Sequence, residues 1–407
     1  MNKIVSLVVA TFLVFVVTAQ QKKVLYIIAD GIPADVIEKI STPTLDAIAK
    51  LGGYTRAHVG GDKDAYSQTP TISAVGYNSL LTGTWVNKHN VWDNDIAVPN
   101  YNYWNIFRLF KTQYPEKKAA IFSTWLDNRT KLIGEGLPQA GNIQLDYHFD
   151  GLELDTVKYP HDKESNYIHL IDEAVVDNAA SYIRANAPDL SWVYLEYTDD
   201  MGHQYGDSKQ FYSAVEMMDV QVSRIWQAIQ YRQKNFKEDW TIFITTDHGR
   251  DSVGGHGGQS DRERTTWIVT NAKDLNNYFH HQKPGIVDIM PTIASLLNIV
   301  IPKEQLTEID GIPLTGKLSA ISPTAQYENG KIKIQWQPLE KTGTMKIWVA
   351  KTNQFKTGGK DDYKLVTQVP LVNGKATIDV SNISSAFYKI VLEAPHNFLN
   401  RWVIVSK

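Results

Sequence analysis

The sequence predicts an α/β protein: a mostly parallel sheet covered by helices on both faces, followed by a small all-β sandwich. Continuous apolar runs such as residues 24–29 and 241–246 are typical of strands buried on both faces of a sheet. Segments with helical periodicity alternate with these runs as far as about residue 297, which indicates parallel strands joined by helices. Beyond about residue 319 the helical periodicity disappears, and short alternating runs are separated by turn signals.

Length and composition agree with this class. A chain of 407 residues, 43% hydrophobic and 21% charged, suits one large domain and one small one. The net charge of -3 argues against general affinity for nucleic-acid polymers or anionic membranes, so we expect neither as a partner. The chain has no cysteine, so any metal site must use aspartate, glutamate, histidine or hydroxyl ligands.

Residues 1–19 are predicted to be a secretory signal peptide. Lys3 supplies a short positive region, residues 4–17 are almost entirely apolar, and small residues end at Ala19. We therefore expect a periplasmic or secreted protein with no membrane span once the signal is removed. The alternative is an uncleaved anchor, although the run is short for a span.

The α/β domain is expected to occupy residues 20–318. Its middle section, residues 123–165, is polar and rich in turns and is interpreted as a substrate-facing insertion. Strands are predicted at residues 23–29, 54–59, 119–122, 192–197, 241–246 and 266–270. Helices are predicted at residues 43–51, 73–83, 171–185, 211–231 and 285–297.

Residues 319–407 are predicted to form the sandwich. Trp336 and the spacing of the strands resemble a fibronectin type III-like module. No catalytic cluster occurs in this part, so we expect it to contact another protein or a glycan. Strands are predicted at residues 331–336, 345–349, 363–366, 376–380, 388–392 and 402–405.

Metal-ligating residue types follow three of the predicted strands. Ligands in such sheets bind beyond the carboxyl ends of the strands, so these side chains are expected to converge there. Carboxylate oxygens and imidazole nitrogens suit a metal ion, and glycine lets the chain turn tightly around it. The alternative is a set of capping aspartates and surface histidines. The residues are Asp30, Asp199, His203, Asp247, His248 and His256.

Ser73 begins a predicted helix, where free N–H groups and the helix dipole favour an anion. That position suits a nucleophile beside a phosphate; the alternative is a simple N-cap. Three aspartates and three histidines suit two zinc ions, which can clamp the attacking and leaving oxygens of an in-line displacement. Together these residues predict covalent catalysis through serine.

These residues resemble the alkaline phosphatase superfamily, and within it the type I phosphodiesterase/nucleotide pyrophosphatase branch. The resemblance extends in order over about residues 23–312. Its motifs are Asp30-Gly31, Pro70-Thr71-Ile72-Ser73 with Thr82-Gly83, His89-Asn90-Val91-Trp92-Asp93-Asn94, Asp199-Asp200-Met201-Gly202-His203, and Thr246-Asp247-His248-Gly249 with His256-Gly257-Gly258.

The resemblance implies a role for each position. It makes Ser73 the nucleophile, with Thr71 as the second choice, and makes Asn94 a donor to a phosphoryl oxygen. It assigns one zinc ion to Asp30, Asp247, His248 and the Ser73 oxygen. It assigns the other ion to Asp199, His203 and His256.

Some positions depart from the family pattern. Residues 74–76 are Ala-Val-Gly where the phosphodiesterase branch usually has Phe-Pro-Asn, and His256 is unusually close to His248. Both departures leave open the choice between monoester and diester. Arg129 and Lys131 lie where related monoesterases contact phosphate, but surface cations are the favoured reading. Tyr77 replaces the arginine that follows the modified residue of sulfatases, which disfavours the usual sulfatase chemistry.

The function predicted is an exported two-zinc hydrolase that cleaves phosphodiester, pyrophosphate or phosphomonoester bonds through a covalent seryl intermediate. Its substrate is expected to be a small phosphate ester or a nucleotide. A related sulfatase, phosphonate hydrolase or phosphoglycerol-type transferase is an alternative of the same fold. A non-catalytic binding protein on a degenerate phosphatase fold is an alternative of another class, and the complete ligand set argues against it.

Overall fold

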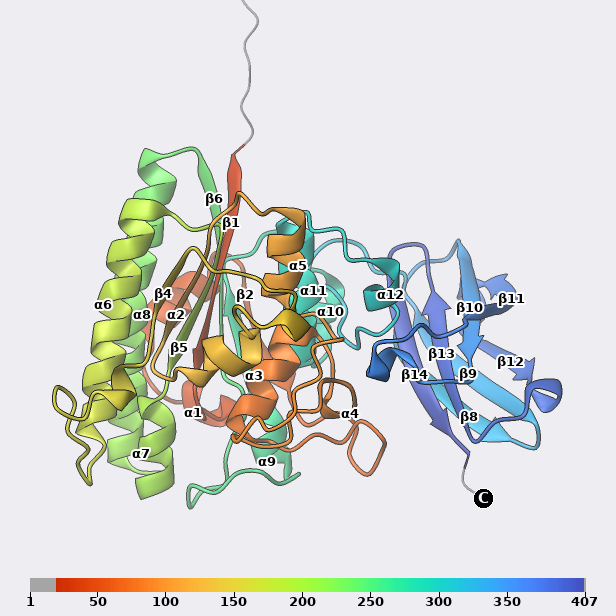
Figure 1. The fold of residues 1–407 in the computed structure, drawn as a ribbon, viewed down its shortest axis with the longest axis horizontal. Helices are drawn as coiled ribbons and strands as arrows, with labels where there is room; N and C mark the ends of the chain where they lie inside the picture. Colours follow the sequence, from red (N-terminus) through yellow and green to blue (C-terminus); the bar gives the residue numbers. More distant parts are fainter. Residues whose placement is uncertain (1–19, 406–407) are drawn as a thin grey trace, which may run out of the picture.

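A seven-stranded sheet forms the centre of the N-terminal part of the protein (Figure 1). This structure is a computed structural model that describes residues 20–405, so the predicted signal peptide lies outside the described residues. The strand order is β2-β7-β6-β1-β5-β3-β4, and only β7 runs against the others. The strands are β1 Gln21–Ala29, β2 Gly53–His58, β3 Ala119–Ser123, β4 Tyr147–Phe149, β5 Leu190–Leu195, β6 Glu238–Thr245 and β7 Thr265–Thr270.

Helices cover both faces of this sheet. Alternate side chains of β1 enter two separate hydrophobic cores, which explains why the strand is apolar without alternation. One core is closed by α3, α5 and α11, and the other by α2, α6 and α8. The predicted fold class is therefore confirmed. The long helices are α2 Pro43–Ala49, α3 Ser73–Thr82, α5 Ile106–Gln113, α6 Asn166–Asn186, α7 Tyr197–Tyr205, α8 Lys209–Asn235 and α11 Ile289–Leu296.

Short helical segments lie between the longer elements. They are α1 Ala34–Ile37, α4 Val86–His89, α9 Asp261–Arg264, α10 Asn277–His281 and α12 Lys303–Leu306. A π-helical turn, Asn128–Ile133, belongs to the predicted insertion. Within residues 20–405, no helix combines the length and apolar character needed to cross a bilayer.

The segment after β5 differs from the prediction. The strand ends at Leu195 rather than at residue 197, and it is followed by helix α7, which was not among the predicted helices. The cause is Asp172 of α6, whose carboxylate accepts hydrogen bonds from the N–H groups of Glu196 (3.1 Å) and Tyr197 (2.9 Å). These bonds satisfy donors that a helix leaves free at its N-terminus. The sequence between residues 190 and 205 carries no sign of this distant partner.

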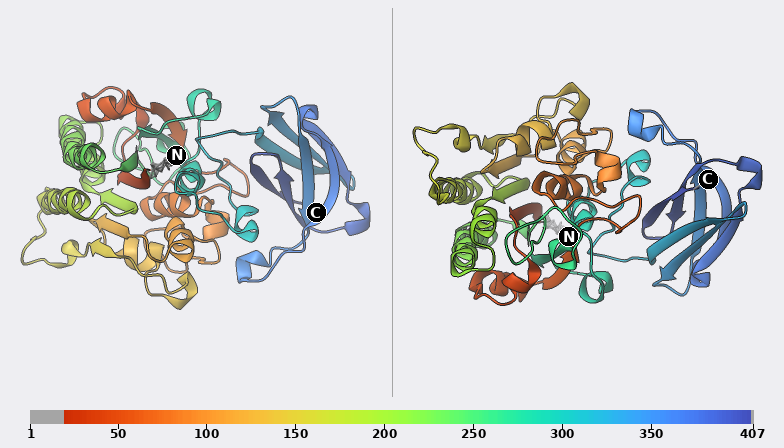
Figure 2. Two further views of the ribbon diagram at one scale, coloured as in Figure 1. Left: turned by 90° about the horizontal axis from the view of Figure 1, so that it is seen from above. Right: turned by 90° about the horizontal axis from the view of Figure 1, so that it is seen from below.

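The C-terminal sandwich consists of a four-stranded sheet, β11-β10-β13-β14, packed on a three-stranded sheet, β12-β9-β8 (Figure 2). Their inner faces enclose a third hydrophobic core that includes Ile334, Trp336 and Ile347. The prediction missed β8, which alternates weakly. The strands are β8 Ala320–Glu328, β9 Lys331–Pro338, β10 Thr344–Ala350, β11 Lys364–Pro370, β12 Lys375–Asp379, β13 Phe387–Glu393 and β14 Phe398–Ile404.

Buried polar contacts join the sandwich to the α/β part. The Lys88 ammonium is fully buried and donates to Asp310 Oδ1 (2.6 Å), Asn400 Oδ1 (2.9 Å) and the Glu308 carbonyl (2.6 Å). The Lys356 carbonyl accepts hydrogen bonds from the side-chain amides of Asn100 (2.8 Å) and Asn102 (3.1 Å). The segment between α4 and α5 is thereby fixed to the sandwich.

We expect Asp310→Ala to destabilise the protein by about 3–5 kcal/mol, because the substitution leaves the buried Lys88 ammonium without its carboxylate. Urea-induced unfolding followed by circular dichroism measures this change. Glu328→Ala serves as the control because Glu328 forms an exposed ion pair with Lys333. This substitution is expected to leave the free energy of unfolding almost unchanged, because exposed ion pairs contribute little to stability. Equal costs for the two variants would contradict the structural role given to Lys88.

Candidate metal centre and active site

Two strand ends bring Asp30, Asp247 and His248 together. Asp30 directly follows β1, and Asp247-His248 follow its neighbour β6. The three side chains are fully buried, and each offers a ligand atom within 4.8 Å of the others. His248 Nε2 lies 3.4 Å from Asp30 Oδ1 and 3.2 Å from Asp247 Oδ2. The other ring nitrogen, Nδ1, lies 2.9 Å from the Gly249 carbonyl, which leaves Nε2 to face the carboxylates as an acceptor.

The donor set of this first group fits a metal ion. Asp30 Oδ1 and Asp247 Oδ2 are buried and have no hydrogen-bond partner among the described residues. Burial raises the pKa of Asp247 to about 7, and burial with the charges of Asp247 and Asp199 raises the pKa of Asp30. Burial also holds the pKa of His248 well below its usual range, so the ring is neutral and able to ligate. A bound cation would stabilise both carboxylates in their ionised form.

Ser73 lies beside this first group. Its Oγ is 3.3 Å from His248 Nε2, at the first residue of α3. Ile72 is the N-cap, so Ser73 is not the simple cap considered as the alternative. Gly76 lets α3 approach β6: a Cβ atom there would lie 2.7 Å from the Asp247 carbonyl oxygen. This close approach gives a physical reason for glycine at position 76.

Asn94 reaches the start of the same helix. Its Oδ1 accepts a hydrogen bond of 3.0 Å from the Ala74 N–H, which places the side chain next to Ser73. Thr71 points elsewhere: its hydroxyl donates to the Gly258 carbonyl (2.9 Å) and accepts from the Gly257 N–H (2.9 Å). Of the two hydroxyl candidates, Ser73 is the one next to the His248 ring.

Asp199, His203 and His256 form the predicted second group, and the structure also brings ligand atoms of Asp199, His256 and His248 within 4.8 Å of one another. Asp199 and His203 are one turn apart on α7, and Asp199 Oδ2 lies 3.2 Å from His203 Nε2. His256 Nε2 lies 2.9 Å from His203 Nε2. Its Nδ1 lies 2.8 Å from the Thr71 carbonyl, which orients the ring. The rings of His256 and His248 stack with centroids 3.8 Å apart, so the two groups adjoin. The structure therefore gathers all six predicted ligands in one place.

Arg250 belongs to this second group but was not predicted. Its buried guanidinium pairs with Asp199 Oδ1 and donates to the carbonyls of Gly31 (2.8 Å) and Gly254 (3.0 Å). A Cβ atom on Gly31 or on Gly202 would collide with this guanidinium, so two glycines make its slot. Although burial opposes ionisation, the hydrogen bond with His203 and the charge of Arg250 lower the pKa of Asp199.

Two tyrosines orient Asp30 from the side away from His248. The hydroxyl of Tyr194 donates to Asp30 Oδ2 at 2.7 Å, and the hydroxyl of Tyr77 donates to the same oxygen. Only Oδ1 then remains for a metal ion. Tyr77 is one turn after Ser73 on α3, so the same helix holds the nucleophile candidate and fixes a ligand. The sequence drew attention to Tyr77 only as a departure from the sulfatase pattern.

Arg129 and Lys131 have partners of their own. Arg129 forms ion pairs with Asp150 (2.7 Å) and Glu135 (2.8 Å), and Lys131 pairs with Asp127 (2.8 Å). These carboxylates compete with any phosphate for the two cations. Lys131 lies at the surface as expected, whereas the Arg129 side chain is only 17% exposed and is held between two carboxylates.

Comparison with known proteins agrees with this geometry. A curated relative, GPI ethanolamine phosphate transferase 2 of Schizosaccharomyces pombe, is 23% identical over 337 residues, which are 74% of this chain and 40% of that protein. Ectonucleotide pyrophosphatase/phosphodiesterase family member 7 of Rattus norvegicus is 23% identical over 71% of this chain and 61% of its own. The chain thus spans less than two thirds of either relative.

A solved structure shows the same fold. A 2-O GAG sulfatase aligns with a TM-score of 0.54 and 13% identity, over 89% of this chain and 86% of its own. The family model for type I phosphodiesterase / nucleotide pyrophosphatase matches residues 24–259, which include Ser73 and all six predicted ligands. The chain belongs to the type I phosphodiesterase / nucleotide pyrophosphatase family.

Proposed function

We propose that this protein is a two-zinc enzyme that cleaves a small phosphate ester through a covalent intermediate on Ser73. The family acts on phosphoesters as hydrolases or transferases and is metal-dependent. The observation that carries the proposal is the position of Ser73. Its hydroxyl lies at the N-terminus of α3, 3.3 Å from His248 Nε2, beside two carboxylates with unpaired oxygens.

Each of these residues has a separate role in the proposed reaction. One zinc ion would be held by Asp30, Asp247, His248 and Ser73, and the other by Asp199, His203 and His256. When bound, such ions would lower the pKa of a coordinated hydroxyl and offset the negative charge that develops during the reaction. Ser73 Oγ attacks phosphorus as the bond to the leaving oxygen breaks, and the helix N-terminus favours the charge that develops. Asn94 donates its amide N–H to a phosphoryl oxygen.

In the second step the bond between Ser73 and phosphorus breaks, and the molecule that accepts the phosphoryl group decides whether the enzyme is a hydrolase or a transferase. Water gives hydrolysis, and an alcohol gives transfer of the phosphoryl group. The second metal group is the more open one, because the His203 side chain is 47% exposed whereas the His248 side chain is fully buried. An acceptor therefore approaches from the side of His203 and His256. We favour water and keep transfer as the second candidate, since the curated relatives include both types.

The proposal places the protein outside the cytoplasm, on the basis of residues 1–19. The substrate is a small phosphate ester or a nucleotide.

Ser73→Ala is expected to abolish turnover of p-nitrophenyl phosphate and bis-p-nitrophenyl phosphate while both zinc ions stay bound. Loss of the nucleophile removes the covalent route, whereas the six Asp and His ligands remain. Acid-quenched protein examined by mass spectrometry should carry the phosphoryl adduct on the peptide that contains Ser73. Full activity of the variant, or an adduct on Thr71 instead, would refute the assignment.

Arg250→Gln is expected to weaken zinc binding at the second group by about 10- to 100-fold, the usual cost of removing a group that orients a metal ligand. The substitution takes away the donor that holds Asp199 Oδ1. Titration of the metal-free protein with zinc, followed by calorimetry, measures the two sites. Arg224→Gln is the matched control because Arg224, on α8, pairs with Glu173 and Asp177 of α6 and with none of the proposed zinc ligands. Equal zinc affinity in the two variants would contradict the role of Arg250.

A further inference from the structure

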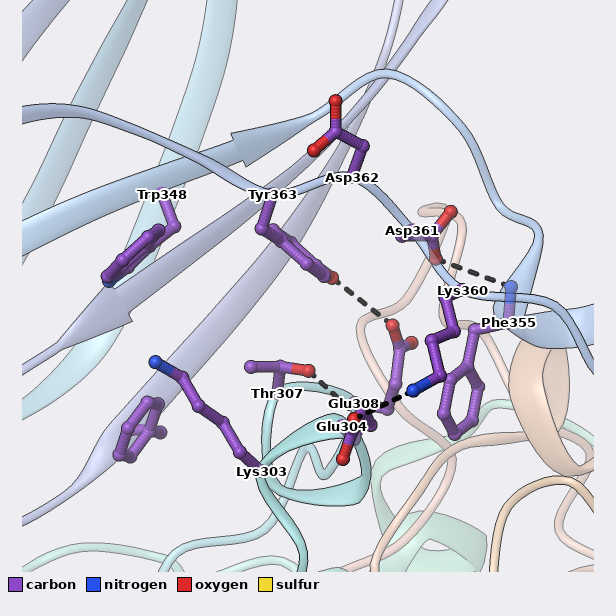
Figure 3. A pocket seen from close by; sticks show the side chains of 11 residues that line it. Lys303, Glu304, Thr307, Glu308, Trp348, Phe355, Lys360, Asp361, Asp362 and Tyr363 are labelled. Carbon is purple, nitrogen blue, oxygen red and sulfur yellow. Dashed lines mark hydrogen bonds and ion pairs between the residues drawn. The ribbon is translucent and has the colours of Figure 1, made fainter.

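A cavity of about 320 Å³ opens where α12 meets the C-terminal sandwich (Figure 3). Four aromatic side chains line it: Trp348 of β10, Phe398 of β14, and Phe355 and Tyr363 between β10 and β11. Residues of α12 and the following turn form the opposite wall. This volume lies within the range of small-molecule pockets, about 300–1,000 Å³. None of the proposed zinc ligands lines it, so the cavity is separate from the proposed active site.

The base of this cavity carries a buried excess of negative charge. Lys389 Nζ lies 2.7 Å from Glu308 Oε1 and 2.7 Å from Asp361 Oδ2, and all three side chains are at most 2% exposed. One ammonium thus faces two carboxylates. The neighbouring buried Lys88 does not supply the missing charge, because its ammonium is paired with Asp310.

One buried acceptor at this base also lacks a partner. Glu308 Oε1 accepts from Tyr363 (3.2 Å) and Lys389, but Glu308 Oε2 has no hydrogen-bond partner among the described residues. A buried carboxylate oxygen without a partner is costly, and native structures normally satisfy such groups. Glu308 lines the cavity, and Figure 3 shows its carboxylate beside the Tyr363 hydroxyl. A positively charged ligand in the cavity would offset the negative charge of the Glu308 carboxylate.

The aromatic walls already attract ammonium groups. Lys303 Nζ lies 4.7 Å from the centre of the Trp348 ring, and Lys389 Nζ lies 5.8 Å from the Phe355 ring. The face of an aromatic ring is negative and binds cations. The Lys303 side chain is 64% exposed, and its carboxylate partner, Glu393, is 3.9 Å away. Lys303 is therefore free to leave the ring when another cation arrives.

We propose that this cavity binds an organic ammonium group. Aromatic faces and two carboxylates that share one ammonium together select a cation, and aromatic faces are known to recognise quaternary ammonium groups. A neutral sugar also stacks on aromatic rings, but it would leave the excess negative charge of Glu308 and Asp361 unbalanced. The site would recognise a small amine or the cationic part of a larger ligand. This inference is independent of the chemistry at Ser73.

Binding of choline to the purified full-length protein tests the proposal, measured by isothermal titration calorimetry. The comparison ligand is 3,3-dimethylbutan-1-ol, which has the same shape without the charge, and glucose represents a neutral sugar. We expect saturable choline binding that is at least about fivefold tighter than binding of the alcohol. Absence of saturable choline binding, equal binding of the alcohol, or preferential binding of glucose would each overturn the proposal.

Two variants locate the site. Trp348→Leu keeps an apolar side chain and removes the π face, and Glu308→Gln keeps the shape and removes the charge. Each is expected to weaken choline binding by at least about fivefold. Trp104→Leu is the matched control, because Trp104 carries the Arg108 guanidinium 4.1 Å from its ring but does not line the cavity.

Thermal unfolding checks that the variants are folded. If Glu308→Gln is unstable, Trp348→Leu alone decides the question, since its side chain is only half-buried at the edge of the interface. Choline affinity that is unchanged in Trp348→Leu, or lowered equally in Trp104→Leu, would refute the site.

Discussion

Three buried aspartates share one site, and their mutual repulsion is the constraint around which the catalytic part is arranged. Burial raises the pKa of Asp30 and of Asp247; the charges of Asp247 and Asp199 raise the pKa of Asp30 further, and the charge of Asp199 raises that of Asp247. The chain offsets this repulsion with three devices: the guanidinium of Arg250 against Asp199, the phenols against Asp30, and the Gly31 N–H against Asp247. Asp30 Oδ1 and Asp247 Oδ2 still lack hydrogen-bond partners, so these two oxygens are available to bind a metal ion.

The sequence predicted the parts that depend on local pattern. Residues that follow parallel strands must reach the same edge of the sheet, so Asp30 and Asp247 were predictable from two apolar runs. Arg250 was not predictable, because the space for its guanidinium exists only where Gly31 and Gly202, from separate segments of the chain, come together. The helix α7 was also not predictable from local pattern, because Asp172, from α6, supplies the acceptor at its start. Strand order and the interface with the sandwich likewise depend on contacts between distant segments.

The two proposed sites would recognise cations in different ways. The proposed catalytic site uses buried carboxylates and neutral imidazoles, which are the ligands of metal ions. The interface with the sandwich uses carboxylates and aromatic faces, which suit an ammonium group. Family membership bears only on the first, since the matched region ends at residue 259. The second is a property of the α12–sandwich junction, in which residues of both parts take part.

The segment between α4 and α5 contacts both the α/β part and the C-terminal sandwich. Asn94 contacts the N-terminus of α3, whereas Asn100 and Asn102 donate hydrogen bonds to the Lys356 carbonyl of the sandwich. The Lys356 ammonium in turn donates to the Asn87 carbonyl (3.3 Å). A few residues of backbone therefore separate a phosphoryl-binding candidate from a joint between domains. A rotation of the sandwich would be transmitted to Asn94 through this short tether, so substrate affinity would report on the orientation of the C-terminal module.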